Sequence, residues 1–195
     1  MATAPHPSRM TVEEYFELCH NNPDTRYEYI DGYIVMMSGG TFNHVGIRDN
    51  VYILIRSGLR GRSCRAYTAD INVRLSATRY VLPDVVVTCD ERDSGENKLM
   101  QSPFLAVEVL SPSTEAYDRG NKFLYYRECP TIQEYVLVSS SFPLIEVFRR
   151  EKNDLWVLTT FKLEDIVQLT TLGISFSVRD VYENIVFPNS EKPIA

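Results

Sequence analysis

The amino-acid sequence predicts a mixed fold, α/β or α+β, in which a mixed central β-sheet is flanked by helices. Two segments, 105–110 and 132–138, are almost continuously apolar, as expected of strands that are buried on both faces. The segment between them has the pattern of a helix, so the three together predict a crossover that joins two parallel strands. A longer amphipathic segment at 43–60 predicts another helix, and short strands recur toward the C-terminus.

The first part of the chain predicts a helix followed by a β-hairpin. Thr11 and Glu14 have the spacing of a capping box, and the helical pattern of residues 11–21 ends before Pro23. In the next segment, YEYI-DG-YIVMM, Asp31-Gly32 separates two runs of alternating aromatic and β-branched residues. An Asp-Gly pair in that setting favours a two-residue hairpin turn.

The remaining elements follow from periodicity and turn residues. The helix at 43–60 has apolar residues at helical spacing and stops at Gly61. Residues 89–102 are charged and turn-forming, which predicts an exposed loop, and Thr114 is a candidate cap for a helix at 115–128. The expected strands are 64–75, 80–88, 105–110, 132–138, 144–150, 155–161 and 166–176, before a short helix at 178–182.

Length and composition predict one domain spanning residues 1–195, with flexible tails at 1–10 and 187–195. A chain of 195 residues, with 44% hydrophobic and 24% charged residues, is long enough for one sizeable core. No apolar run is long enough to span a bilayer, and the N-terminus lacks the layout of a secretory signal. We therefore expect a cytoplasmic protein with no membrane partner.

Charge is distributed unevenly along the chain. The net charge of −6 argues against binding nucleic acid through an overall positive field. Between Arg48 and Arg65, however, five arginines stand against one acid, Asp49. This segment is either a local basic surface or an ordinary solvated helix face and loop.

The cysteines predict neither a zinc site nor a disulfide framework. They occur singly, with no CxxC pair, so we expect them to be reduced. The four are Cys19, Cys64, Cys89 and Cys129.

Two apolar strands each carry one acid, Asp84 in VLPDVVV and Glu108 in LAVEVL. Burying a charge is costly unless a partner or a metal compensates it. If the strands are neighbours, the two carboxylates converge, and a cation between them relieves their repulsion. Mg²⁺ or Mn²⁺ suits such oxygen ligands in phosphate chemistry. The alternative is that each acid is solvated at a strand end or pairs with an arginine.

Lys122 lies on the helix that follows, four residues beyond Asp118. Either the two residues form a surface ion pair, or the turn folds the helix back and delivers the ammonium beside Glu108. In the second case Lys122 orients or deprotonates the attacking water and stabilises charge on the phosphorus.

These residues lie within motifs that resemble a known family. Pro83-Asp84, Glu108-Val109-Leu110 and SPSTEAYDRGNKF are similar to the motifs of the Uma-type family of restriction-endonuclease-like proteins, within the PD-(D/E)XK nuclease superfamily. Further blocks of the family follow in order along nearly the whole chain: MTVEEYFEL, RYEYIDGYIV, GGTFNH, LRGRSCRAY, LPDVVVTCD and EYVLV. The resemblance implies a restriction-endonuclease-like core and metal-dependent cleavage of DNA phosphodiesters.

The resemblance also implies a set of site residues. Asp84 and Glu108 would hold Mg²⁺ or Mn²⁺, with the backbone carbonyl of Val109 as a further ligand. Glu28, in RYEYIDG, matches an acidic position that joins or flanks the metal site and is counted with the catalytic residues.

The sequence departs from the superfamily pattern at one position. A lysine is expected two residues after Glu108, where this chain has Leu110. Lys122 then takes its place from the following helix, as in superfamily members with a relocated lysine.

Four other polar residues near these motifs have two interpretations each. His44, in TFNHVG, is either a cap or surface residue at the helix start or a support for the site. Ser111 and Thr114 either orient Glu108 through hydrogen bonds or serve the turn. Asp70, expected to begin the strand DINVRL, is interpreted as a structural cap or hydrogen-bond acceptor.

The sequence supports three hypotheses of function. The first is a Mg²⁺-dependent or Mn²⁺-dependent endonuclease that hydrolyses duplex DNA. The second, motivated by Leu110 and the acidic net charge, is a catalytically inactive protein of the same fold that binds DNA or a protein partner. The third is a phosphoesterase acting on another nucleic acid or nucleotide. Tyr126 and Trp156, taken as exposed aromatics, and the symmetry of duplex DNA favour a homodimer.

Overall fold

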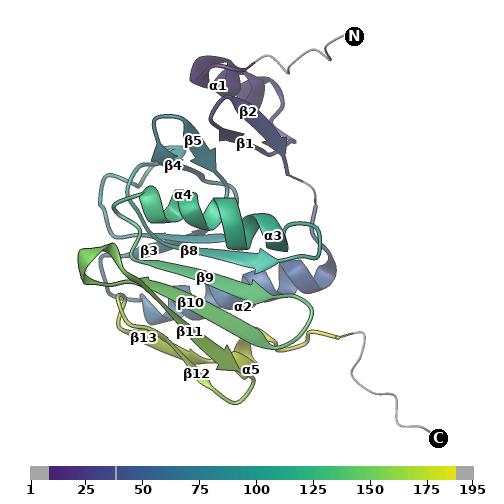
Figure 1. Cartoon of the computed structure of the whole chain (residues 1–195), viewed down its shortest axis with the longest axis vertical. Helices are drawn as coiled ribbons and strands as arrows, with labels where there is room; N and C mark the ends of the chain where they lie inside the picture. The colour runs from purple at the N-terminus through teal and green to yellow at the C-terminus, as the bar shows by residue number, and fades with distance from the viewer. Residues whose placement is uncertain (1–8, 38, 188–195) are drawn as a thin grey trace, which may run out of the picture.

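The computed structural model describes residues 9–37 and 39–187, which form three β-sheets with helices packed around them (Figure 1). The helices are α1 (Val12–Asn21), α2 (Phe42–Gly58), α3 (Glu115–Tyr117), the π-helix η1 (Asp118–Lys122), α4 (Phe123–Glu128), the 3-10 helix η2 (Lys152–Asp154) and α5 (Val178–Val181). The strands are β1 (Tyr27–Ile30), β2 (Tyr33–Met36), β3 (Arg65–Thr68), β4 (Asn72–Ser76), β5 (Arg79–Val81), β6 (Val85–Thr88), β7 (Leu99–Met100), β8 (Pro103–Leu110), β9 (Glu134–Ser139), β10 (Leu144–Arg150), β11 (Trp156–Lys162), β12 (Ile166–Leu169) and β13 (Ile174–Ser177). The mixed architecture predicted from the sequence is confirmed.

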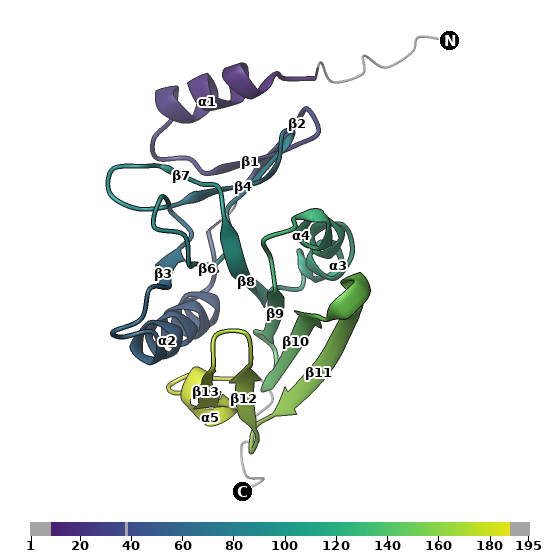
Figure 2. The same cartoon turned by 90° about the vertical axis from the view of Figure 1, so that its left-hand side faces the viewer.

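A six-stranded sheet forms the centre of the molecule, in the order β11-β10-β9-β8-β6-β3. Its strands β8 and β9 are parallel and are joined through α3, η1 and α4, which confirms the predicted crossover. The other pairs in this sheet are antiparallel, so the sheet is mixed. The helix α2 lies on one face of it and α3 and α4 lie on the other (Figures 1 and 2).

A five-stranded sheet, in the order β2-β1-β5-β4-β7, forms with α1 the N-terminal end of the molecule (Figure 2). The predicted capping box at the start of α1 is present, since Thr11 and Glu14 each accept from the other's backbone N–H. The predicted hairpin is also present. Asp31 and Gly32 have φ of 50° and 97°, which suits a two-residue turn between β1 and β2.

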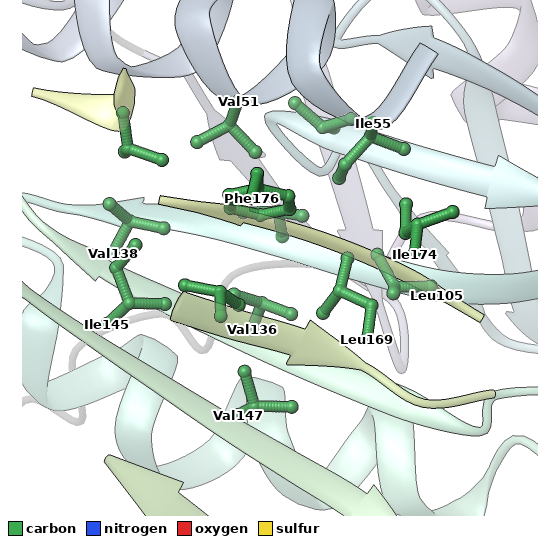
Figure 3. Close-up of a cluster of buried hydrophobic side chains, with 14 of the residues drawn as sticks. Val51, Ile55, Leu105, Val136, Val138, Ile145, Val147, Leu169, Ile174 and Phe176 are labelled. Atoms are coloured by element: carbon green, nitrogen blue, oxygen red, sulfur yellow. The ribbon is translucent and has the colours of Figure 1, made fainter. Parts of the chain in front are cut away.

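Two hydrophobic cores cover the two faces of the six-stranded sheet. In the first, Val51 and Ile55 of α2 face Leu105 of β8 and Val136 of β9, and Phe176 of β13 lies between Val51 and Val136 (Figure 3). In the second, the opposite face of the same strands packs against α4 and the five-stranded sheet. Because both faces are buried, β8 and β9 must be apolar along almost their whole length.

Each of the two long strands predicted at 64–75 and 80–88 is in fact two strands. The chain turns at residues 69–71 and again at residues 82–84, so β3 and β6 belong to the six-stranded sheet while β4 and β5 belong to the five-stranded one. Pro83 explains the second break, because proline has no N–H to continue a ladder. Asp84 therefore lies in the bend just before β6 rather than inside a strand.

Several predicted details are wrong for local reasons. Thr114 makes no side-chain capping bond and already has helical φ and ψ. Asp70 lies in the turn before β4 and does not begin the strand, although its exposed carboxylate pairs with Arg26 at 2.9 Å, in agreement with its interpretation as an acceptor. The segment 166–176 is a hairpin of β12 and β13, with Gly173 at φ of 61° in the turn. The loop at 89–102 contains the short strand β7.

The predicted tails fall almost entirely outside the described residues, which exclude 1–8 and 188–195. At their inner ends, Met10 and Phe187 are packed. The Met10 N–H donates to the Gly32 carbonyl at 2.9 Å, and the ring of Phe187 lies 5.6 Å from that of Tyr182.

The expectation that all four cysteines are reduced is wrong for two of them. Cys64 and Cys89 form a disulfide, whereas Cys19 and Cys129 are free thiols. The antiparallel register of β3 and β6 pairs Arg65 with Thr88, so the flanking cysteines meet across the strands. A separation of 25 residues without a CxxC motif gave no signal of this pairing.

None of the helices within residues 9–37 and 39–187 combines the length and the apolar character needed to cross a bilayer.

Candidate active site

The polar residues predicted to form a site are buried where the two large sheets meet. Glu28 comes from β1 of the five-stranded sheet, and Glu108 comes from β8 of the six-stranded sheet. Lys122 ends the π-helix η1. Side-chain exposure is only 1% for Glu28, 5% for Glu108 and 2% for Lys122. The fold thus gathers charges from three elements into one interior position.

Lys122 is the centre of this cluster. Its Nζ lies 3.0 Å from Oε1 of Glu28, 2.9 Å from Oε1 of Glu108 and 4.0 Å from Oδ1 of Asp118. Asp118 is itself buried, so the interpretation of Asp118 and Lys122 as a surface pair is wrong. The alternative, in which the helix folds back and delivers the ammonium beside Glu108, is what the structure shows.

The predicted helix at 115–128 is interrupted by a π-helical turn at the residues that matter for the site. Asp118–Lys122 forms η1, and ordinary α-helix resumes at Phe123. Single π-helical turns are rare and occur frequently at functional sites. Both end residues of this turn, Asp118 and Lys122, are buried, whereas Gly120 between them is exposed.

Glu108 is held by an ammonium and a phenol. In addition to Lys122, the hydroxyl of Tyr126 donates to its Oε1 at 2.8 Å. Burial raises the pKa of Glu108 well above its ordinary range; Lys122 opposes the shift, and Asp118, Asp84 and Glu28 reinforce it. The carboxyl group therefore favours keeping a proton unless another cation approaches.

The pKa of Lys122 is also displaced upward. Burial lowers this pKa, but the carboxylates of Glu108, Glu28 and Asp118 outweigh burial and hold it well above its ordinary range. The two shifts share a direction for different reasons: burial is the largest cause for Glu108, whereas the surrounding carboxylates raise the pKa of Lys122 against burial. The ammonium stays charged, and the excess negative charge calls for a proton or a further cation.

Asp84 is positioned by backbone pairing and by His44. The antiparallel register of β6 and β8 places Val85 opposite Val107, which puts Asp84 opposite Glu108 one residue further on. The Val109 N–H donates to Oδ2 of Asp84 at 2.8 Å. Nε2 of His44 lies 3.0 Å from Oδ1 of the same carboxylate. His44 is thus a neighbour of the predicted site and not a mere surface residue.

The donor set suits a hard divalent cation. Four acids, Glu28, Asp84, Glu108 and Asp118, face a single amine, and Oε2 of Glu28 is buried without a hydrogen-bond partner. In the described part of the chain, no group of three or more His, Cys, Asp or Glu side chains is arranged to hold a metal. Mg²⁺ is commonly bound by only one or two carboxylates together with waters, so Asp84 and Glu108 are the candidates for holding it.

Two positions singled out in the sequence, Ser111 and Leu110, take no part in the charged cluster. The hydroxyl of Ser111 contacts those of Ser113 and Thr114, each at 3.0 Å, and has no bond to Glu108. Ser111 therefore stabilises the turn and does not orient Glu108. Leu110, at the position where a lysine was expected, is buried in the second hydrophobic core.

Sequence reasoning missed two residues of the cluster. Asp118 had been considered only as a surface partner of Lys122, and Tyr126 was taken to be exposed, whereas both are buried. Trp156 is half-buried and packs edge-on against Phe123, so neither aromatic supports a dimer surface. Helical spacing could have found Asp118 and Tyr126, because each lies four residues from Lys122.

Comparison with solved structures defines the class of protein by its fold. The chain matches a structure described as "a putative nuclease belonging to DUF820" from Anabaena variabilis, with a TM-score of 0.75. The match covers 91% of this chain and 99% of that one at 18% sequence identity. The mixed sheet with flanking helices is therefore the fold of that protein.

The chain belongs to the Uma2 family, described as "Putative restriction endonuclease", whose model matches residues 12–179. This confirms the resemblance seen in the motifs. Two proteins of Synechocystis sp. are relatives. The protein slr1290 is 37% identical over 186 residues, covering 95% of this chain and 97% of its own length. The protein sll1609 is 28% identical over 153 residues, covering 77% and 86%.

Proposed function

We propose that this protein is a Mg²⁺-dependent or Mn²⁺-dependent endonuclease that hydrolyses phosphodiester bonds of duplex DNA. The observation that carries the proposal is the position of Lys122, whose ammonium lies within 3.0 Å of both Glu28 and Glu108. A lysine from the next helix thus reaches the acid pair although Leu110 stands at the usual lysine position. Family membership supports the same reaction class.

The carboxylates of Asp84 and Glu108 would hold the metal ion, with the Val109 carbonyl as a further ligand. When bound, Mg²⁺ would supply positive charge that polarises the scissile phosphate and lowers the pKa of water. In the reaction, water gives a proton to solvent as its oxygen bonds to phosphorus, one phosphorus–oxygen ester bond breaks, and the leaving oxygen takes a proton from solvent. The chain's part is to hold charge and geometry for this exchange.

Lys122 acts in this proposal as a fixed positive charge. Its pKa is held well above its ordinary range by the neighbouring carboxylates, which supports a charged ammonium that orients the water rather than an amine that deprotonates it. An ammonium beside the acid pair stabilises the negative charge that develops on the phosphate oxygens. Glu28 holds the ammonium in place and also accepts from the Leu82 N–H at 2.9 Å.

His44 and Tyr126 act through the acids that they contact. His44 fixes one oxygen of Asp84 while the Val109 N–H fixes the other. Tyr126 fixes Oε1 of Glu108 from α4. These contacts set the orientation of both carboxylates before a metal ion binds, which is the usual role of polar groups behind metal ligands.

The proposal is tested by incubating purified protein with supercoiled and linear duplex DNA in the presence of Mg²⁺, Mn²⁺ or EDTA. Cleavage is expected with either metal and not with EDTA, and Asp84→Ala is expected to abolish it. Cleavage that is unaffected by Asp84→Ala would overturn the assignment. Binding of DNA without cleavage under any of these conditions would favour the inactive nuclease-fold protein that Leu110 suggests.

A homodimer in the cytoplasm remains part of the proposal, because two symmetry-related sites suit the two strands of a duplex. Sedimentation of the purified protein tests the dimer directly.

A further inference from the structure

A cavity lined by arginines lies away from the acid cluster, between the C-terminal part of α2 and strand β3. Its volume is about 740 Å³. Four arginines line it and no acidic residue does; two tyrosines, Tyr52 and Tyr67, supply aromatic surface beside them. The arginines are Arg56, Arg60, Arg62 and Arg65. The structure thus decides between the two interpretations of this segment in favour of a local basic surface.

The positive charge of this surface is not neutralised by the protein. Arg60 and Arg65 are exposed, and no side-chain hydrogen bond or ion pair joins them to any residue within 9–37 and 39–187. Arg56 donates to the hydroxyl of Tyr52 at 2.5 Å, and Arg62 donates to the Leu172 carbonyl at 2.5 Å. Both of these acceptors are uncharged. Other arginines differ, since Arg79, Arg119 and Arg179 each pair with a carboxylate.

The backbone that carries these arginines is fixed on both sides. The helix α2 is anchored in the first hydrophobic core by Ile55 and Leu59. Strand β3 is tied to β6 by the disulfide of Cys64, the residue next to Arg65. A rigid basic surface loses less conformational entropy on binding an anion than a mobile one does.

The same two elements connect this surface to the acid cluster. His44, which contacts Asp84, lies in the first turn of α2, and Arg56 lies twelve positions later in the same helix. That separation is roughly 18 Å along the helix axis at 1.5 Å per residue. Strand β3 also ends beside the cluster, since Thr68 pairs with Val85, the neighbour of Asp84. Figure 2 shows α2 alongside β3 and β6.

The spacing fits an extended polyanion rather than a small one. A distance of roughly 18 Å corresponds to about five base pairs of duplex DNA at 3.4 Å per base pair. A protein with a net charge of −6 repels DNA at long range, so it requires a local positive surface to hold the backbone.

We propose that the surface formed by Arg56, Arg60, Arg62 and Arg65 binds the phosphate backbone of duplex DNA that flanks the cleaved bond. This proposal rests on the proposed nuclease function and adds the place where the substrate is held. The contacts are to phosphates, so they position the duplex without reading its sequence.

The test is the binding of a fluorescein-labelled DNA duplex, followed by fluorescence anisotropy in EDTA so that no cleavage occurs. The variant Arg60→Ala/Arg65→Ala removes the two arginines without internal partners. It is expected to bind at least about tenfold more weakly than the native protein at moderate salt. The slope of log Kd against log salt concentration is expected to fall by about two, one for each lost phosphate contact.

A matched control is Arg74→Ala/Lys152→Ala, which removes the same charge from exposed positions on β4 and η2. It is expected to bind as the native protein does. Equal binding by both double variants would overturn the proposal. Inorganic phosphate can be compared with unlabelled DNA as a competitor at the same concentration of phosphate groups. If both displace the labelled duplex equally well, the surface binds a small anion and the proposal is also overturned.

The outcomes separate this inference from the proposed function. If the native protein cleaves DNA and Asp84→Ala does not, but Arg60→Ala/Arg65→Ala binds normally, the nuclease assignment stands and only the binding surface is wrong. If the native protein binds no duplex DNA at all, both fail together.

Discussion

Two glutamates are buried on the two neighbouring parallel strands at the centre of the six-stranded sheet. Glu108 lies on β8 and Glu134 begins β9. Both have at most 4% of their surface exposed, and burial raises the pKa of both. Burying a carboxylate in a core strand costs free energy unless something compensates it. On burial alone, each glutamate is therefore an equally strong candidate for a functional residue.

Their surroundings differ completely. Glu108 faces α4, where it meets Lys122 and Tyr126 and lies near three other acids. Glu134 shares its face with Val136 and Val138 of the first core, and it accepts from the backbone N–H and the hydroxyl of Thr171. No second acid is among the groups that shift its pKa.

The difference shows that burial of one carboxylate does not define a site. Glu134 ties β9 to the turn between β12 and β13 through Thr171, and two hydrogen bonds explain its presence. Glu108 has a charged partner and an excess of nearby acids, which two hydrogen bonds would not explain. The convergence of several charges, and not the burial of one, therefore distinguishes the catalytic candidate.

The sharpest test of this comparison is one conservative substitution in each glutamate. Glu108→Gln keeps the shape but removes the negative charge of a proposed metal ligand, so cleavage of DNA with Mg²⁺ is expected to fall by at least about a hundredfold. Glu134→Gln is expected to cleave DNA at the native rate. Initial rates of plasmid nicking measure both. Equal losses in the two variants would remove the distinction between them.

Lys122 provides the next largest effect, on stability. Lys122→Met leaves Glu28, Glu108 and Asp118 buried without their cation, and we expect a loss of about 3 to 5 kcal/mol in the free energy of unfolding. The matched control is Arg119→Met on the same π-helical turn. Its ion pair with Glu146 is partly exposed, so its removal should cost no more than about 1 kcal/mol.

Urea denaturation near pH 7 measures both variants. If Lys122→Met lowered the free energy of unfolding no more than Arg119→Met did, Lys122 would not stabilise the buried carboxylates as we expect.

The smallest expected effect is a pH dependence at Glu134. Burial raises its pKa above the unfolded value despite the hydrogen bonds from Thr171. The native state therefore binds more protons than the unfolded state, and the contribution to stability is complete at low pH and lost as pH rises through the native pKa. Glu134→Gln does not titrate, so it should match the native protein at low pH and become relatively more stable as pH rises. A stability difference that is constant with pH, or that falls, would contradict this.

Much of the fold could be predicted because its signals are local. The Asp31-Gly32 turn and the Thr11–Glu14 capping box are each contained within four residues, and both are present. The crossover from β8 to β9 was also predictable, since two apolar strands separated by a helix have few arrangements available. The convergence of Glu28, Glu108 and Lys122 agrees with the family motifs, although their assigned roles remain predictions.

What could not be predicted depends on contacts between distant parts of the chain. The chain passes from the five-stranded to the six-stranded sheet at Pro83, and this depends on which strands the segments before and after Pro83 pair with. The Cys64–Cys89 bond depends on the register of β3 and β6. The burial of Tyr126 depends on which face of α4 turns toward Glu108. The disulfide leaves no pattern in the residues beside it. Pro83 marks where a strand breaks, and the four-residue spacing of Lys122 and Tyr126 marks a shared helix face, but neither pattern says which sheet or partner follows.

The most direct test of the central claim is diffraction from crystals of the protein soaked in Mn²⁺, with anomalous data collected to locate the ion. We expect one anomalous peak coordinated by the carboxylates of Asp84 and Glu108, with the Lys122 ammonium nearby. The peak should be lost in Glu108→Gln and kept in Glu134→Gln. An ion bound elsewhere, or no peak at these two carboxylates, would contradict the assignment of this cluster as a metal-dependent active site.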